Sequence, residues 1–253
     1  MRKFVVAAVA GLAFATMAVV SATADTTTTP TTTTPSSSTW PAIHVTPTVT
    51  PNKAGTKAKP QAVHLKVNVG WQTLGAANQP IVTHFNVLFP KGALYNGTKY
   101  PKCSASVLSN EGPAGCPKAS IMGGGTGVAY ADTTLTRPKI TVVNGGANTV
   151  YFYTVLNNPA RVQEPIAGHL TKMSGKWAYA LNVTVPANLR IVAGVPIELT
   201  SLSVSAGNSA GWLSTTGCAG GKWPFQLTTQ YLNSNSGATG SSTYSASVAC
   251  KAS

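Results

Sequence analysis

The stretch that decides the fold runs from Phe85 to Asp132 and reads FNVLFPKGALYNGTKYPKCSASVLSNEGPAGCPKASIMGGGTGVAYAD. It begins with an alternating apolar segment and ends with a glycine-rich one, and both patterns are typical of β-strands. Between them lies a long segment with two of the four cysteines. Long loops inside a compact domain are commonly functional or cross-linked. We therefore expect a disulfide-stapled loop between two strands.

The same alternation recurs along most of the chain, with Gly- and Pro-rich turns between the apolar segments. Many short strands of this kind predict an all-β fold, either a sandwich or a barrel. We expect an antiparallel β-sandwich, jelly-roll-like or Ig-like, with a single short helix over 104–111 that Ser104 would cap. About eleven strands are expected, at 63–69, 83–89, 121–131, 139–143, 150–156, 165–171, 178–185, 196–205, 212–216, 225–231 and 243–250.

The first 24 residues have the pattern of a secretory signal: a basic start, an apolar run from Phe4 to Val20, and an A-x-A site at Ala22 and Ala24. The alternative is an uncleaved membrane anchor. Residues 25–62 are rich in Thr and Pro and predict a disordered stalk. The predicted order is therefore signal peptide 1–24, stalk 25–62 and β-domain 63–253, with no transmembrane segment after cleavage.

The charge composition is unusual. Only 9% of residues are charged, against about 25% in an average protein. After removal of the signal, 16 basic residues face 5 acidic ones, a net charge of +11. An exported basic protein is expected outside the cell, secreted or associated with the cell wall. There it would meet anionic wall polymers or glycans rather than nucleic acid.

Four cysteines in an exported chain predict two disulfides. Cys103 and Cys116 are close in sequence, with glycine and proline between them, so we expect them to pair. Cys218 would then pair with Cys250, although four cysteines also allow two crossed pairings. A metal site is disfavoured because the sequence has neither a C-x2-C motif nor a nearby pair of histidines. No cofactor is expected.

The loop also has a recognisable pattern, C-x4-L-x3-G-P-x2-C-P-x2-S-x2-G-x-G, preceded by F-P-x-G at 89–92. The pattern resembles a set of uncharacterised secreted β-rich proteins of actinobacteria. The resemblance covers most of residues 63–251. It implies export and a β-rich fold, and it brings neither an activity nor catalytic residues.

Catalytic signals are weak. Gly207–Gly211 matches G-x-S-x-G, but no Asp, Glu or His follows Ser209 to complete a triad. The predicted domain holds four carboxylates, too few and too scattered to predict a glycosidase pair; they are Glu111, Asp132, Glu164 and Glu198. We therefore assign no catalytic residue.

The best interpretation is a structural or ligand-binding protein of the cell envelope. The alternative is a carbohydrate-active enzyme, a glycan hydrolase or lyase, on a β-sandwich scaffold. A ligand site is expected around the stapled loop, where lysines and tyrosines are interleaved and only Glu111 opposes them. The candidate residues are Lys91, Tyr95, Lys99, Tyr100, Lys102 and Lys118. The oligomeric state stays open.

Overall fold

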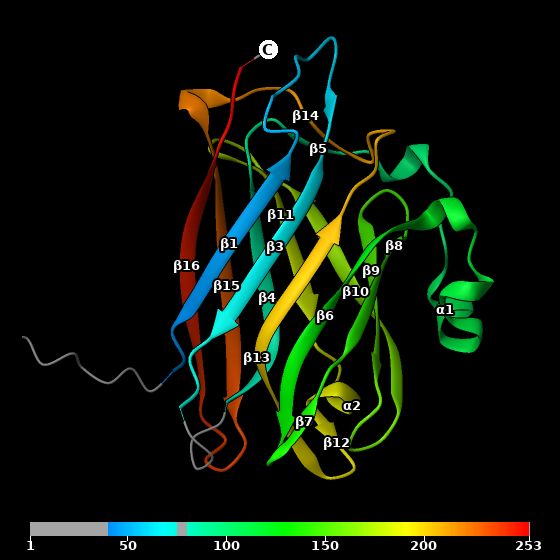
Figure 1. Ribbon diagram of the computed structural model, residues 1–253, viewed down its shortest axis with the longest axis vertical. Coiled ribbons are helices and arrows are strands. Elements are labelled where there is room, and N and C mark those ends of the chain that lie inside the picture. Colours follow the sequence, from blue (N-terminus) through cyan, green and yellow to red (C-terminus); the bar gives the residue numbers. More distant parts are fainter. Residues whose placement is uncertain (1–39, 75–79, 253) are drawn as a thin grey trace, which may run out of the picture. The chain divides into compact units, whose positions relative to one another are not determined.

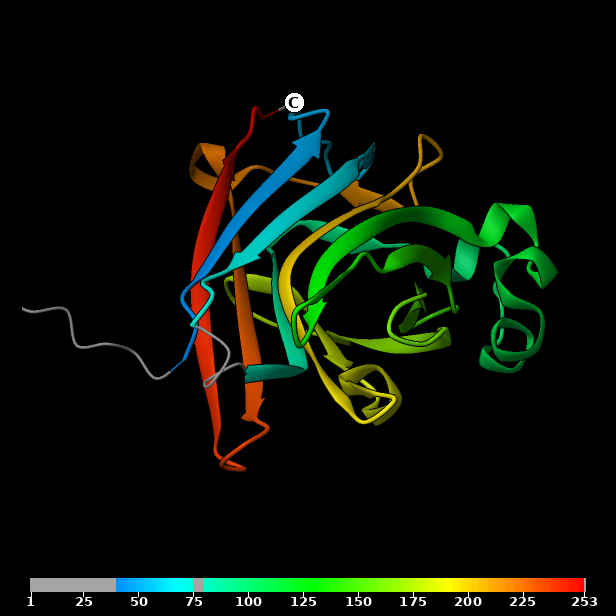
Figure 2. The same cartoon turned by 60° about the horizontal axis from the view of Figure 1, so that its bottom comes forward.

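The structure is a computed structural model that describes residues 40–74 and 80–252. The expected signal peptide and the first part of the stalk, up to residue 39, lie outside these residues. The remainder belongs to one folded unit, whose strands surround a common axis (Figures 1 and 2).

Thirteen strands form one large antiparallel sheet. The hydrogen-bonded order is β1-β3-β13-β6-β8-β9-β10-β11-β4-β15-β16, with β7 beside β6 and β12 beside β13. The bounds are β1 (Ile43–Thr50), β3 (His64–Trp71), β4 (Pro80–Pro90), β6 (Ile121–Ala131), β7 (Thr134–Thr136), β8 (Lys139–Asn144), β9 (Thr149–Leu156), β10 (Val162–Lys172), β11 (Trp177–Thr184), β12 (Ile191–Val192), β13 (Val195–Ala206), β15 (Lys222–Asn233) and β16 (Thr239–Ala249).

The sheet curls until its first and last strands lie side by side, which makes it nearly closed and barrel-like (Figure 1). Side chains join β1 to β16 along this seam. The Ser242 hydroxyl donates to the Pro41 carbonyl at 2.7 Å, and the His44 ring lies edge-on to the Tyr244 ring at 5.4 Å. Beyond the strand ends, Lys53 and Lys251 form a parallel bridge.

Smaller elements lie at the two ends of the barrel. At one end is a three-stranded sheet, β2 (Gln61–Ala62), β14 (Leu213–Thr215) and β5 (Ala93–Tyr95). The short helix α2 (Ala187–Arg190) lies with β12 at the opposite end (Figures 1 and 2). Helix α1 (Ala105–Glu111) lies outside the barrel, beside β8 and β9 (Figure 1).

The all-β antiparallel prediction is confirmed, and each of the eleven expected strands is present. Five strands were not expected: the eight-residue β1 and the short strands β2, β5, β7 and β12. Helix α1 begins after Ser104, whose hydroxyl accepts from the Val107 N–H as expected of an N-cap. The architecture differs from that of two packed sheets, because one sheet curls until it is nearly closed and its inward faces pack against each other.

The stalk prediction is wrong for its last part, because β1 and β2 lie within residues 25–62. Proline and threonine suggested disorder there, yet Ile43, Val45 and Val49 are buried while the threonines between them face outward. Pro47 lacks an N–H group, and β1 tolerates it because the strand is hydrogen-bonded on one side only.

Both predicted disulfides are confirmed. Cys103 bonds to Cys116 across 13 residues, and Cys218 bonds to Cys250 across 32. The glycines of β6 allow neighbouring strands to approach closely. A Cβ atom at Gly125 would collide with the carbonyl oxygen of Ser203 on β13.

Candidate functional site

The most prominent feature of the barrel is a cavity of about 320 Å³ along its interior. Inward-facing residues of most strands line it, because alternate residues of a strand point to the same side. The lining is almost wholly apolar. Its exceptions are three tyrosines, the neutral polar residues and one charged residue: Tyr95, Tyr179, Tyr244, Thr154, Ser214, Thr215, Gln226 and Arg190.

The cavity is long. On β4 its lining extends from Ile81 to Pro90, which is about 30 Å of strand at roughly 3.3 Å per residue. A volume of about 320 Å³ over such a length makes the cavity narrow. Its size falls at the lower end of ligand-binding cavities, which are mostly about 300–1,000 Å³.

The α2 end of the cavity combines an apolar and a charged residue. Leu189 is buried and packs in a cluster with Val192 and Ile197. The next residue, Arg190, lines the cavity, and its Nε atom is buried without a hydrogen-bond partner. The neighbouring Asn188 side chain points elsewhere and donates to Glu164 Oε2 at 2.7 Å.

At the β14 end, two aromatic rings pack around a buried amide. Asn144 is fully buried, and its Nδ2 donates to the carbonyl oxygens of Gly97 and Pro101 at 2.9 and 3.0 Å. Its Oδ1 accepts from Trp212 Nε1 at 3.1 Å and from the Tyr95 hydroxyl at 2.9 Å. The two rings meet edge-on at 5.2 Å. Asn144 thereby ties the stapled loop to the sheet.

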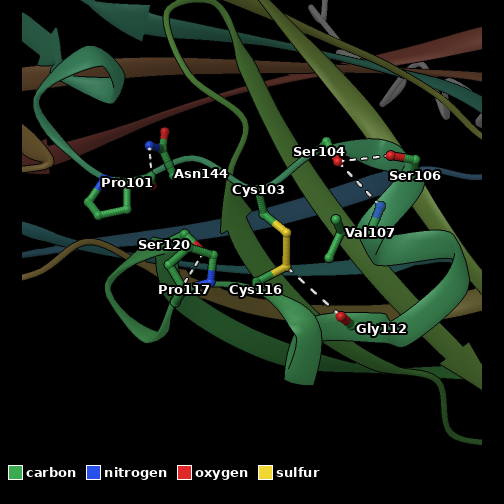
Figure 3. The surroundings of a disulfide bond; sticks show 10 residues. All are labelled: Pro101, Cys103, Ser104, Ser106, Val107, Gly112, Cys116, Pro117, Ser120 and Asn144. Carbon is green, nitrogen blue, oxygen red and sulfur yellow. Dashed lines mark hydrogen bonds between the residues drawn. A yellow bond between two sulfur atoms is a disulfide. The ribbon is translucent and has the colours of Figure 1, made fainter.

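The loop closed by the Cys103–Cys116 disulfide lies outside the barrel against β8 and β9 (Figure 1), and Figure 3 shows the surroundings of this disulfide. Leu108 of α1 and the disulfide pack in one cluster with Val143 and Tyr153, which lie on β8 and β9. The Cys103 N–H donates to the Asn144 carbonyl at 2.9 Å. This arrangement gives the loop a structural role at the barrel wall, away from the interior cavity.

The structure places the predicted ligand-binding residues in different surroundings. The four lysines, Lys91, Lys99, Lys102 and Lys118, are all exposed. Lys102 lines an open hollow of about 360 Å³ beside the disulfide, and the other three lysines are not part of its lining. Tyr100 is half-buried and packs near Trp212.

Tyr95 lines the interior cavity and does not belong to a surface site. Its hydroxyl lies within 2.9 Å of three acceptor oxygens, on Asn144, Gly146 and Thr149. Burial raises the pKa of Tyr95 far above its usual value, and the nearby Trp212 only partly offsets this. The hydroxyl is therefore used within the protein and remains protonated.

The four carboxylates stay apart from both cavities. Glu111 and Asp132 are exposed, and Glu164 bonds to Asn188. Glu198 is only 5% exposed, and burial raises the pKa of its carboxyl. Among residues 40–74 and 80–252, no group of three or more His, Cys, Asp or Glu side chains is placed to hold a metal ion.

Sequence reasoning missed the cavity and Arg190. The alternation did mark which residues face inward, for example Trp223, Phe225 and Leu227 on β15. A sandwich core and a barrel interior produce the same alternation, so the pattern did not reveal free space. Arg190 lies in a short segment between two strands, and nothing in its sequence context marks it.

No known family model matches the chain, and no curated protein matches it either. The site therefore has to be interpreted from its own geometry. In the part of the chain that the structure describes, no helix is long and apolar enough to cross a membrane.

Proposed function

We propose that this protein is an exported ligand-binding protein of the cell envelope that holds an apolar small molecule inside its barrel. The observation that carries this proposal is the cavity of about 320 Å³ with its almost wholly apolar lining. Protein interiors are normally packed as densely as organic crystals. Apolar side chains around a free space lack contact partners, and an apolar ligand would supply them.

The location in the envelope is supported by two independent features. Residues 1–24 have the pattern of a secretory signal. The chain also carries two disulfides, which persist mainly in oxidising compartments. An exported barrel with an apolar interior is suited to carrying a water-insoluble molecule across an aqueous space.

The test is titration with N-phenyl-1-naphthylamine, a neutral apolar dye that fluoresces when it leaves water. We expect saturable binding of one dye per chain. The variant Val87→Phe places a ring inside the cavity and should weaken binding at least fivefold. The control Gln230→Phe adds the same ring at an exposed position and should leave the affinity unchanged. Absence of saturable binding to the wild type would refute the proposal.

A second candidate function is binding of an anionic wall polymer by the exposed lysines around the stapled loop. Such binding must weaken as salt rises, because exposed charges are screened over about 10 Å at 0.1 M. Retention on isolated cell wall at low and high salt tests it. The comparison variant carries glutamine at Lys91, Lys99, Lys102 and Lys118. Equal retention of both proteins would show that the loop is purely structural.

The alternative function, a carbohydrate-active enzyme, is supported by fewer observations than ligand binding. A hydrolase of that class generally needs two carboxyl groups flanking the substrate. Neither the interior cavity nor the hollow at Lys102 has a described carboxylate in its lining.

A further inference from the structure

Arg190 is the only charged residue among the described residues that line the interior cavity. It is the last residue of α2, which lies at one end of the barrel (Figure 2). Its Nε atom is buried and lacks a hydrogen-bond partner. A buried donor on a cation is costly when it is left unpaired, so a partner is expected at this position.

The described part of the protein does not supply that partner. Glu164 contacts α2, but its carboxylate accepts a hydrogen bond from the Asn188 side chain rather than from Arg190. Glu198 follows Ile197 on β13 and is buried, but its Oε2 atom is also without a partner. No ion pair joins a described carboxylate to Arg190. A guanidinium beside a long apolar space is therefore available for an anion that enters with the ligand.

We propose that Arg190 binds the carboxylate of a long-chain fatty acid whose alkyl chain lies along the cavity toward β14. This inference rests on the proposed function, since it assumes that the cavity holds a ligand. The guanidinium presents paired N–H donors in the geometry that a carboxylate accepts. The narrow apolar length of the cavity suits a single unbranched chain.

The polar groups elsewhere in the lining favour one orientation of the ligand. The Thr154 and Ser214 hydroxyls donate to backbone carbonyls of Phe152 and Gly211. Thr215, at the β14 end, has a free buried hydroxyl but no charge. Only the α2 end can neutralise an anion, so the head group should lie there.

The experiment compares palmitate with hexadecanol, which has the same chain length and a neutral head. Both are titrated into the full chain by displacement of N-phenyl-1-naphthylamine. The wild type should bind palmitate at least tenfold more tightly than hexadecanol. Arg190→Gln should remove this preference by weakening palmitate alone. Arg161→Gln removes an exposed arginine and should keep the preference.

Arg190→Lys provides a second variant, because it keeps the charge and loses the paired donor geometry. It should retain a preference for palmitate that is smaller than in the wild type. Equal wild-type affinity for the two ligands would overturn the head-group proposal and leave the proposed function intact. An equal preference for palmitate over hexadecanol in Arg190→Gln and Arg161→Gln would also overturn the head-group proposal and leave the proposed function intact. If neither ligand nor the dye binds the wild type, the proposed function itself fails.

Discussion

The hydroxyl groups of Tyr95 and Tyr231 differ in their hydrogen bonding. The Tyr95 hydroxyl reaches three acceptor oxygens, whereas the Tyr231 hydroxyl is buried without a hydrogen-bond partner. Burial raises the pKa of both, and neighbouring polar groups only partly offset it. The two residues therefore form a matched pair for measuring what a buried hydroxyl contributes.

Tyr95→Phe should lower the free energy of unfolding by about 1 kcal/mol, because it removes the hydroxyl that hydrogen-bonds to the Asn144, Gly146 and Thr149 oxygens. Tyr231→Phe should change it by less than about 0.5 kcal/mol or raise it slightly, because this hydroxyl lies near the Ser242, Thr229 and Trp71 side chains without making a well-formed hydrogen bond. Urea unfolding followed by tryptophan fluorescence measures both. A larger loss for Tyr231→Phe would contradict the hydrogen bonding described above.

Glu198 should make stability depend on pH. Burial raises the pKa of its carboxyl above the unfolded value. Protonated Glu198 is therefore favoured in the folded state, and stability is lost as the pH rises through the raised pKa. Glu198→Gln should be more stable than the wild type by about 1 kcal/mol at neutral pH.

The advantage of Glu198→Gln should vanish toward pH 4, where the wild-type carboxyl is protonated as well. Unfolding curves between pH 4 and pH 8 give the measurement. The control Glu111→Gln removes an exposed carboxylate on α1. A stability advantage of Glu198→Gln that grows as the pH falls would contradict a raised pKa of Glu198 in the folded state.

At the scale of elements, the two disulfides hold loops of different size. In the chain-entropy model the 13-residue closure stabilises by about 3 kcal/mol and the 32-residue closure by about 4 kcal/mol. Replacing Cys103 and Cys116 together by alanine should therefore cost slightly less than replacing Cys218 and Cys250. Denaturant unfolding of the two double variants tests the order. A much larger cost for the first pair would show that the loop also organises β8 and β9.

The seam between β1 and β16 should be the most dynamic part of the sheet. Alternate N–H groups of β1 point away from β3, its one hydrogen-bonded neighbour. From Gln226 to Leu232, β15 is paired on both sides, with β4 and with β16. Amide hydrogen exchange should be fast at every second residue of β1 and slow over this part of β15. Uniformly slow exchange in β1 would indicate a fully closed barrel in solution.

At the scale of the whole molecule, an occupied cavity should stabilise the fold. A ligand that binds only the folded state adds about 2.7 kcal/mol at a concentration of 100 Kd. Palmitate should therefore raise the melting temperature of the wild type, and the rise should be smaller in Val87→Phe. Differential scanning calorimetry at several ligand concentrations measures it. A melting temperature that does not respond to palmitate would contradict binding inside the barrel.

The sequence by itself predicted eleven of the strands, the capped helix α1 and both disulfides. These depend on local chemistry: the period-2 alternation of side chains, the Ser104 hydroxyl, and the short spacing between cysteines. It did not predict β1, because Pro47 and the threonines are typical of both a stalk and an edge strand. Only pairing with β3 distinguishes the two.

The tertiary structure alone decided that the sheet curls until it is nearly closed, that its interior keeps free space, and that Arg190 lines that space. Alternation says which residues share a face, but it does not say which strands become neighbours. Closure depends on the number of strands and on their register, which are long-range properties of the chain. Arg190 meets the cavity because α2 lies at one end of the barrel, and that placement results from contacts between segments far apart in the sequence.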